Sequence, residues 1–156
     1  MRNTVETRDE AMKSTLGEGP WQEEPDRVEW RHAGFPCLIV RADVTGALCG
    51  YVGLPEGHPW FEADIHEIDV SVHGGLTYGA ACQGHICHAP REGESDNVFW
   101  IGFDCSHAFD VSPKFVHLGF RSSLLNGTYR GVRYVMHEVE ELANQALEAR
   151  SAEKPP

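Results

Sequence analysis

Histidine, cysteine and aspartate residues are concentrated in one stretch of this sequence. Residues 58–117 hold seven of the nine histidines and three of the five cysteines. Imidazole, thiolate and carboxylate groups bind transition metals and transfer protons near neutral pH. These groups fall within four short motifs, which are Gly57-His58-Pro59, His73-Gly74-Gly75-Leu76-Thr77, Cys82-x4-Cys87-His88 and Asp104-Cys105-Ser106-His107-x2-Asp110. We therefore expect the functional site of the protein within this stretch.

One set of these residues matches the ligands of an open metal centre. It supplies two imidazoles and two carboxylates, which suit zinc or another divalent transition metal, and its members are His73, Asp104, His107 and Asp110. In a metal-dependent hydrolase, Asp104 or Asp110 would be the catalytic carboxylate that takes a proton from metal-bound water. A polar loop whose aspartates cap turns and whose histidines face solvent has the same pattern, so both interpretations stay open.

The cysteines offer alternative chemistry in the same stretch. Three thiolates and one imidazole complete a closed tetrahedral zinc site, and the residues of this alternative set are Cys82, Cys87, Cys105 and His107. A thiolate at Cys105 or Cys82 with a histidine as base would instead be a nucleophile. Cysteines that simply pack as small apolar residues are the remaining interpretation.

The segments that must position these groups have mostly β-type patterns. Residues 66–73 alternate most regularly, with Ile68, Val70 and Val72 facing one way, so we expect a strand that ends at His73. A short Gly-containing turn at 44–46 separates two apolar segments and predicts a hairpin. The other expected strands are 28–32, 37–41, 48–54 and 97–105. The last of these is apolar on both faces, so we expect it at the centre of the sheet.

A long amphipathic helix is expected at the end of the chain. Apolar residues from Val132 to Leu147 recur at three- and four-residue spacing, and Thr128 is a candidate cap. Strands followed by one helix predict an α+β fold, an antiparallel sheet with one long C-terminal helix packed on a face. We expect a flexible acidic arm at 1–27, a single domain at 28–150 and a frayed tail at 151–156.

The charge of the chain limits its partners. The formal net charge is −11, and acids outnumber bases seven to four in 1–27, twelve to seven in 28–136 and five to two in 137–156. A surface that is acidic throughout repels phosphate backbones, so we expect no nucleic acid and no membrane partner. The chain shows neither a secretory signal nor an apolar run of about 18 residues. These features predict a cytoplasmic protein with reduced cysteines.

The motifs between residues 49 and 110 resemble those of a protein family. Cys49-Gly50-Tyr51-Val52, the Gly-His-Pro and His-Gly-Gly-Leu-Thr motifs, and Trp100-Ile101-Gly102-Phe103-Asp104-Cys105-Ser106-His107-x2-Asp110 resemble small proteins of actinobacteria and their phages. The resemblance covers about the middle two-fifths of the chain. That family has no assigned activity, so the resemblance implies only a small accessory protein of bacterial or phage origin.

Two functions follow from the sequence. The first is a small zinc-type metal-binding protein, in its fullest form a metal-dependent hydrolase acting on a small molecule. The second is a non-catalytic binding or accessory protein of bacterial or phage origin, whose acidic surface engages a protein partner. The substrate, the identity of the metal and the oligomeric state are not determined by the sequence.

Overall fold

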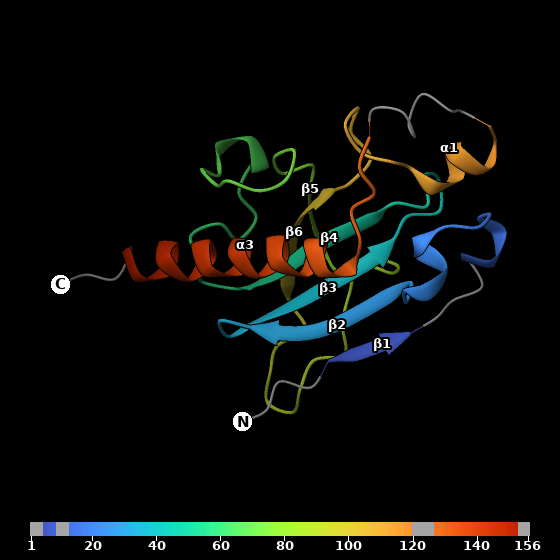
Figure 1. Cartoon of the computed structure of the whole chain (residues 1–156). Helices are drawn as coiled ribbons and strands as arrows, with labels where there is room; N and C mark the ends of the chain where they lie inside the picture. The colour runs from blue at the N-terminus through green and yellow to red at the C-terminus, as the bar shows by residue number, and fades with distance from the viewer. Residues whose placement is uncertain (1–4, 9–12, 120–126, 153–156) are drawn as a thin grey trace.

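The computed structural model describes residues 5–8, 13–119 and 127–152, and an antiparallel sheet is its main element (Figure 1). The strand order is β1-β2-β3-β4-β6-β5. The strands are β1 (Glu6–Arg8), β2 (Arg27–His32), β3 (Phe35–Arg41), β4 (Leu48–Pro55), β5 (Tyr78–Ala81) and β6 (Val98–Asp104). The helices are α1 (Pro113–His117), α3 (Val132–Ala152) and three short 3₁₀ turns, η1 (Lys13–Thr15), η2 (Pro20–Glu23) and η3 (Ile65–Glu67).

Helix α3 crosses one face of the sheet, so the predicted α+β fold is confirmed (Figure 1). The expected hairpin is present as β3 and β4, and β2 and β3 form a second one. Ala33 and Gly34 join β2 to β3 with positive φ angles of 55° and 87°, which is the geometry of the two-residue turn that follows the twist of a hairpin. The expected central strand is β6, which pairs with β4 and β5.

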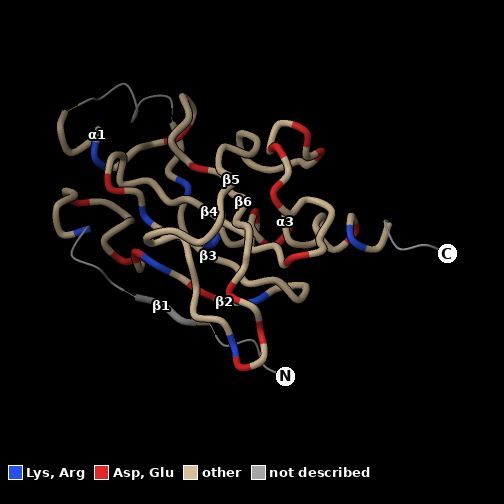
Figure 2. Tube along the Cα trace, turned by 180° about the vertical axis from the view of Figure 1, so that it is seen from behind, with Lys and Arg blue, Asp and Glu red and all other residues tan. Residues whose placement is uncertain are grey.

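The two faces of the sheet are covered differently. Under α3 lies the main core, which includes Phe35, Ile39 and Leu54 from the strands and Val139 and Leu142 from the helix. The opposite face carries a smaller apolar cluster made of Leu38, Cys49, Tyr51, Val98 and Trp100. The loop of residues 82–97 lies over that second face, as the views from both sides show (Figures 1 and 2). Its Ile86 packs against the smaller cluster.

Residues 66–73 do not form the strand that their alternation predicts. Ile68 is buried and Val70 and Val72 pack against the main core, so the expected inward face is present. The backbone of Ser71, however, bonds to the Gln145 side chain of α3, with its N–H donating over 2.9 Å and its carbonyl accepting over 2.9 Å. Side chains of α3 thus provide hydrogen bonds that a neighbouring strand would otherwise provide. The strand prediction was wrong because alternating apolar residues indicate which side chains are buried and do not indicate which segment pairs with the backbone.

A buried ion pair joins the segment before β2 to the end of β3. Arg41 is 1% exposed, and its Nε donates to Asp26 Oδ1 over 2.6 Å. Its Nη1 also donates to the carbonyl of Gly46 over 2.9 Å and to the Tyr129 hydroxyl over 3.1 Å. A buried charge is tolerated only when it is paired and hydrogen-bonded. Arg41 meets that condition by binding three separate segments of the chain.

The start of α3 is fixed by a glutamate from that same segment. Glu24 Oε2 accepts from the Val132 backbone N–H over 2.6 Å, and Glu24 Oε1 accepts from the Tyr129 hydroxyl over 2.6 Å. A carboxylate at a helix N-terminus satisfies a free N–H and interacts favourably with the helix dipole. Glu24 therefore takes the capping role that we expected of Thr128.

The described residues before β2 pack against the rest of the structure, and the flexible arm at 1–27 stays a prediction. Strand β1 pairs with β2, and Leu16 and Trp21 are each 3% exposed in a cluster with Val111. The Trp21 indole also donates to the Gly17 carbonyl over 2.7 Å. A buried tryptophan anchors such a segment through its large apolar area. The limits of the single domain stay a prediction.

Acidic and basic positions are distributed over the sheet, the loops and helix α3 (Figure 2). No helix in the described part of the chain combines the length and the apolar character needed to cross a membrane.

Replacing Arg41 with methionine should destabilise the protein strongly. The change leaves the buried carboxylate of Asp26 without its guanidinium, and breaking a buried pair in this way costs about 3–5 kcal/mol. The free energy of unfolding from urea denaturation measures the loss. Arg133→Met on the exposed face of α3 is the matched control and should change stability by less than about 0.5 kcal/mol. Similar stabilities for the two variants would contradict the role given to Arg41.

Candidate functional site

Three of the predicted site residues meet beside the first turn of α3. The Nε2 atom of His73 lies 2.9 Å from Asp110 Oδ2, and the Nδ1 atom of His107 lies 3.2 Å from the same oxygen. One ligand atom from each of the three residues lies within 4.8 Å of the other two. This His-His-Asp group could hold a metal ion, and it is the only such group found among the described residues.

The turn after β6 places two of these residues. The Asp110 N–H donates to the His107 carbonyl over 2.9 Å, and the His107 N–H donates to Asp110 Oδ2 over 3.0 Å. A carboxylate that accepts from a nearby backbone N–H is the usual way in which aspartate closes a turn. The turn is also tied to residue 128, because the Thr128 N–H donates to the Phe109 carbonyl over 2.8 Å.

His73 comes from the segment that runs along α3. Its backbone N–H donates to Glu138 Oε1 of the helix over 2.8 Å, and its Nδ1 lies 2.8 Å from the Tyr134 hydroxyl. Both partners are on α3 four residues apart, so they lie on one side of the helix. The helix thus fixes both the backbone and the ring of His73.

Gly74 allows the two imidazoles to approach one another. Its φ of +68° lies in the left-handed region that favours glycine. A Cβ built on Gly74 would overlap the His107 imidazole. The rings of His73 and His107 are 5.4 Å apart at an interplanar angle of 69°. Glycine is therefore needed at position 74 both for the turn and for the space that His107 fills.

Asp110 is the central group of the site. It is 3% exposed and receives four hydrogen bonds, from His73, from the ring and the backbone of His107, and from Arg130. Burial raises the pKa of Asp110, but the hydrogen bonds from His73, Arg130 and the His107 backbone outweigh burial and hold the pKa below its ordinary value. The group is therefore an ionised carboxylate, with three of its four hydrogen bonds on Oδ2 and one on Oδ1.

The two oxygens of Asp110 face different partners. Oδ2 faces the imidazoles, whereas Oδ1 accepts from Arg130 Nε over 3.0 Å. The Arg130 guanidinium also lies 4.8 Å from the centre of the Tyr134 ring, a cation–π contact. Neither Arg130 nor Tyr134 belongs to the metal-binding set predicted from the sequence. Tyr134 belongs to a row of polar residues on one side of α3, and this row is the sequence feature that could have identified it. Its members Tyr134, Glu138 and Gln145 all contact residues 71–73.

Asp104 lies next to the group but is not part of it. Its Oδ1 is 3.8 Å from His107 Nε2 and accepts from the Thr77 hydroxyl over 3.1 Å, while Oδ2 accepts a short hydrogen bond from Ser106. Burial raises the pKa of Asp104. The hydrogen bonds from Ser106 and Thr77 and the charge of His107 lower the pKa by more than burial raises it, so the net shift is downward. Asp104 is therefore an ionised carboxylate at the rim of the site.

The alternative zinc set of Cys82, Cys87, Cys105 and His107 is not assembled. Cys82 and Cys87 are joined in a disulfide, so they offer no thiolate to a metal. Cys105 is 1% exposed and packs in the main core. The expectation that all five cysteines are reduced was wrong for this pair, because the turn of residues 83–86 brings the two sulfurs together. The cytoplasmic location stays a prediction.

His58 has a structural role, as its Gly-His-Pro context suggests. It is 4% exposed, with Nε2 lying 2.8 Å from the Ala146 carbonyl and Nδ1 accepting from the Trp60 N–H over 3.0 Å. The imidazole links the turn after β4 to the last part of α3.

Comparison of the chain with protein-family models, with curated proteins and with solved structures finds no match. The resemblance to small actinobacterial and phage proteins stays a prediction.

Gly74→Ala should disturb His107 as well as the turn, and Gly75→Ala is its matched control. Both glycines have positive φ, at +68° and +80°, so each alanine variant loses roughly 1–2 kcal/mol from backbone strain. Only at position 74 does a Cβ also meet the imidazole, since nothing lies within 4 Å of a Cβ at Gly75. We expect the NMR signals of the His107 ring to shift in the first variant alone. Equal shifts in both variants would contradict the contact.

The three free thiols should be unreactive at pH 8 in the folded protein. Burial raises the pKa of Cys37 to about 12 and that of Cys49 to about 11, and it raises the pKa of Cys105 as well. Thiolates are the reactive form. Labelling with a thiol reagent should therefore require denaturant, and Cys82 and Cys87 should react only after reduction. Rapid labelling of Cys105 in the folded protein would restore it as a candidate nucleophile.

Proposed function

We propose that the protein binds one divalent transition metal ion, with zinc the best match, through His73, His107 and Asp110. The observation that carries the proposal is the convergence of two imidazole nitrogens and one carboxylate oxygen within 4.8 Å. A combination of nitrogen and oxygen donors of this kind is typical of zinc sites, where the metal–ligand distances are about 2.0–2.2 Å. Only small side-chain adjustments separate the present contacts from such a shell.

Two of the proposed ligands have a hydrogen-bonded second partner, and the third, His107, has a carboxylate 3.8 Å from its other ring nitrogen. His73 Nδ1 contacts the Tyr134 hydroxyl, Asp110 Oδ1 contacts Arg130, and His107 Nε2 faces Asp104. Metal-binding histidines nearly always use their other ring nitrogen in this way, because the contact fixes the ring and its tautomer. The outer contacts therefore support a built ligand set in preference to an accidental cluster.

The ligand number favours a reactive site over a structural one. Three protein ligands leave a coordination position for water or substrate, whereas closed structural sites use four. A metal in such a site lowers the pKa of its bound water and polarises substrate oxygens, the chemistry of hydrolysis. Asp104 is an ionised carboxylate at the rim of the site, 3.8 Å from His107 Nε2, so we assign it the role of proton acceptor. Asp110 acts as a ligand in this proposal, with Oδ2 turned from its imidazole contacts to the metal.

A second function, binding of a protein partner without catalysis, is supported by an exposed apolar residue within the site. Phe109 lies in the turn between His107 and Asp110 and is 74% exposed. Exposed apolar side chains can mark interaction sites. In this alternative the His-Asp-Arg group is a hydrogen-bonded scaffold for the turn that presents Phe109.

Metal analysis of the purified full chain tests the first proposal. We expect about one zinc per chain after dialysis, and we expect zinc to raise the free energy of unfolding by about 2.7 kcal/mol at a hundred times its dissociation constant. His73→Ala and His107→Ala should lose both the metal and the stabilisation. His66→Ala and His137→Ala are matched controls, because both side chains are exposed and lie outside the group.

Two results would decide against metal binding. One is a chain that takes up no zinc, manganese or iron on titration, and the other is equal metal content in all four histidine variants. Either result would leave the hydrogen-bonded scaffold as the role of the group, and would favour the partner-binding function.

A further inference from the structure

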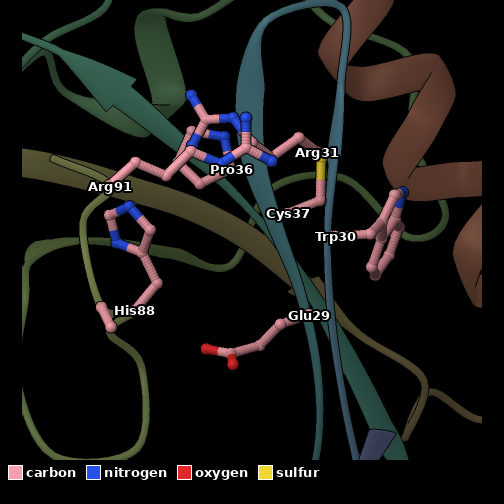
Figure 3. Close-up of a pocket in the computed structure, with 8 residues that line it drawn as sticks. Glu29, Trp30, Arg31, Pro36, Cys37, His88 and Arg91 are labelled. Atoms are coloured by element: carbon pink, nitrogen blue, oxygen red, sulfur yellow. The ribbon is translucent and has the colours of Figure 1, made fainter. Parts of the chain in front are cut away.

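A cavity lies on the face of the sheet opposite α3. It has a volume of about 280 Å³, is partly open to solvent, and lies between β2, the start of β3 and residues 88–91 of the 82–97 loop (Figure 3). Cavities of about 300–1,000 Å³ hold drug-sized ligands, so this one suits a smaller molecule. It shares no lining residue with the His-His-Asp group.

The loop that covers this cavity is anchored at several points. Arg27 donates to the carbonyls of His85 over 2.5 Å and Cys87 over 2.6 Å. The Cys82–Cys87 disulfide closes the same turn. Further along, Glu94 accepts from Arg31 of β2 over 2.9 Å. Side chains of the sheet thus hold both ends of the loop, so the cavity beneath it is a built feature of the fold.

One end of the cavity is cationic. The side chains of Arg31 and Arg91 extend toward one another above Pro36, with the His88 ring beside them (Figure 3). Arg31 is already paired with Glu94, whereas the Arg91 guanidinium has no partner among residues 5–8, 13–119 and 127–152. Burial lowers the pKa of His88, so its ring is neutral at pH 7 and can donate or accept a hydrogen bond.

The other end of the cavity is anionic. The Glu29 carboxylate lies away from the two arginines in Figure 3 and accepts from Arg27 through one oxygen, at 2.9 Å. Glu29 and Arg31 are two residues apart on β2, so they share one face with Cα atoms roughly 7 Å apart. Between them the lining is formed by uncharged residues, among them Pro36 and Ala89.

From this arrangement we infer that the cavity binds a small zwitterion, with the chemistry of a free α-amino acid. Its carboxylate pairs with Arg91 and His88, and its ammonium group pairs with Glu29. A molecule carrying only one of these charges makes only one of the two contacts. A zwitterion has no net charge, so the acidic surface of the protein does not repel it.

Titration of the full-length protein with a panel of the common L-amino acids tests the inference. Binding is followed through the NMR signals of the His88 ring, with acetate and methylammonium as probes that carry one charge each. At least one amino acid should shift these signals saturably, and its affinity should exceed that of either single-charge probe by about tenfold or more. Glu29→Gln and Arg91→Gln should each weaken its binding by a similar factor. Glu29→Gln keeps the size of the side chain, and Arg91→Gln replaces the guanidinium with a shorter uncharged amide.

Matched variants on α3 separate this effect from a general change in charge. Glu141→Gln and Arg133→Gln alter the same charges on exposed positions of the helix, and both should bind like the unmodified protein. Binding should also persist in His73→Ala, which keeps the test independent of the proposed metal site. The inference is overturned if no amino acid shifts the His88 signals, if acetate binds as tightly, or if all four variants bind alike.

Discussion

The buried guanidinium of Arg41 is the interaction on which the positions of the other segments depend. It pairs with Asp26 before β2, binds the Gly46 carbonyl in the turn after β3, and meets the Tyr129 hydroxyl just before α3. Tyr129 in turn donates to Glu24, the residue that caps the helix. A guanidinium has five donors in a fixed plane, so it holds these segments at set directions. Arg130, which contacts Asp110, immediately follows Tyr129 in the chain.

The different coverings of the two sheet faces explain the two different sites. On the α3 face a long helix fills the space with apolar side chains, and functional groups are confined to its edge, where the helix meets the turn after β6. On the opposite face a loop has few apolar residues with which to fill the space, so hollows remain between it and the strands. Loops are held at a surface by a few polar contacts, and here those contacts come from the arginines of β2.

Sequence patterns predicted the elements whose signals come from residues close together in the chain. They failed for segments whose contacts come from residues far away in the chain. The β3–β4 hairpin and α3 were predicted because turn residues and three-four spacing are local signals. Residues 66–73 were misassigned because their hydrogen-bond partners are side chains of a helix about 70 residues later. His73, His107 and Asp110 were predicted as members of one set, and the structure brings them within 4.8 Å of one another, whereas only the fold brings Arg130 to Asp110. The Cys82–Cys87 disulfide is a local contact at a sequence separation of 5, and it was missed because reduced cysteines were expected.

The position of Arg130 decides how the His-His-Asp group can carry a metal. A guanidinium on a ligand carboxylate adds positive charge, which opposes a divalent cation. Here the opposition is limited, because Arg130 binds Oδ1 whereas both imidazoles face Oδ2. The cation and the arginine would thus take different oxygens, and Arg130 would orient the ligand from outside, as second partners do in metal sites. Asp104, 3.8 Å from His107, supplies a further negative charge at the same edge. Because Arg130 and the two imidazoles contact different oxygens of Asp110, an arginine beside this carboxylate is compatible with a metal site.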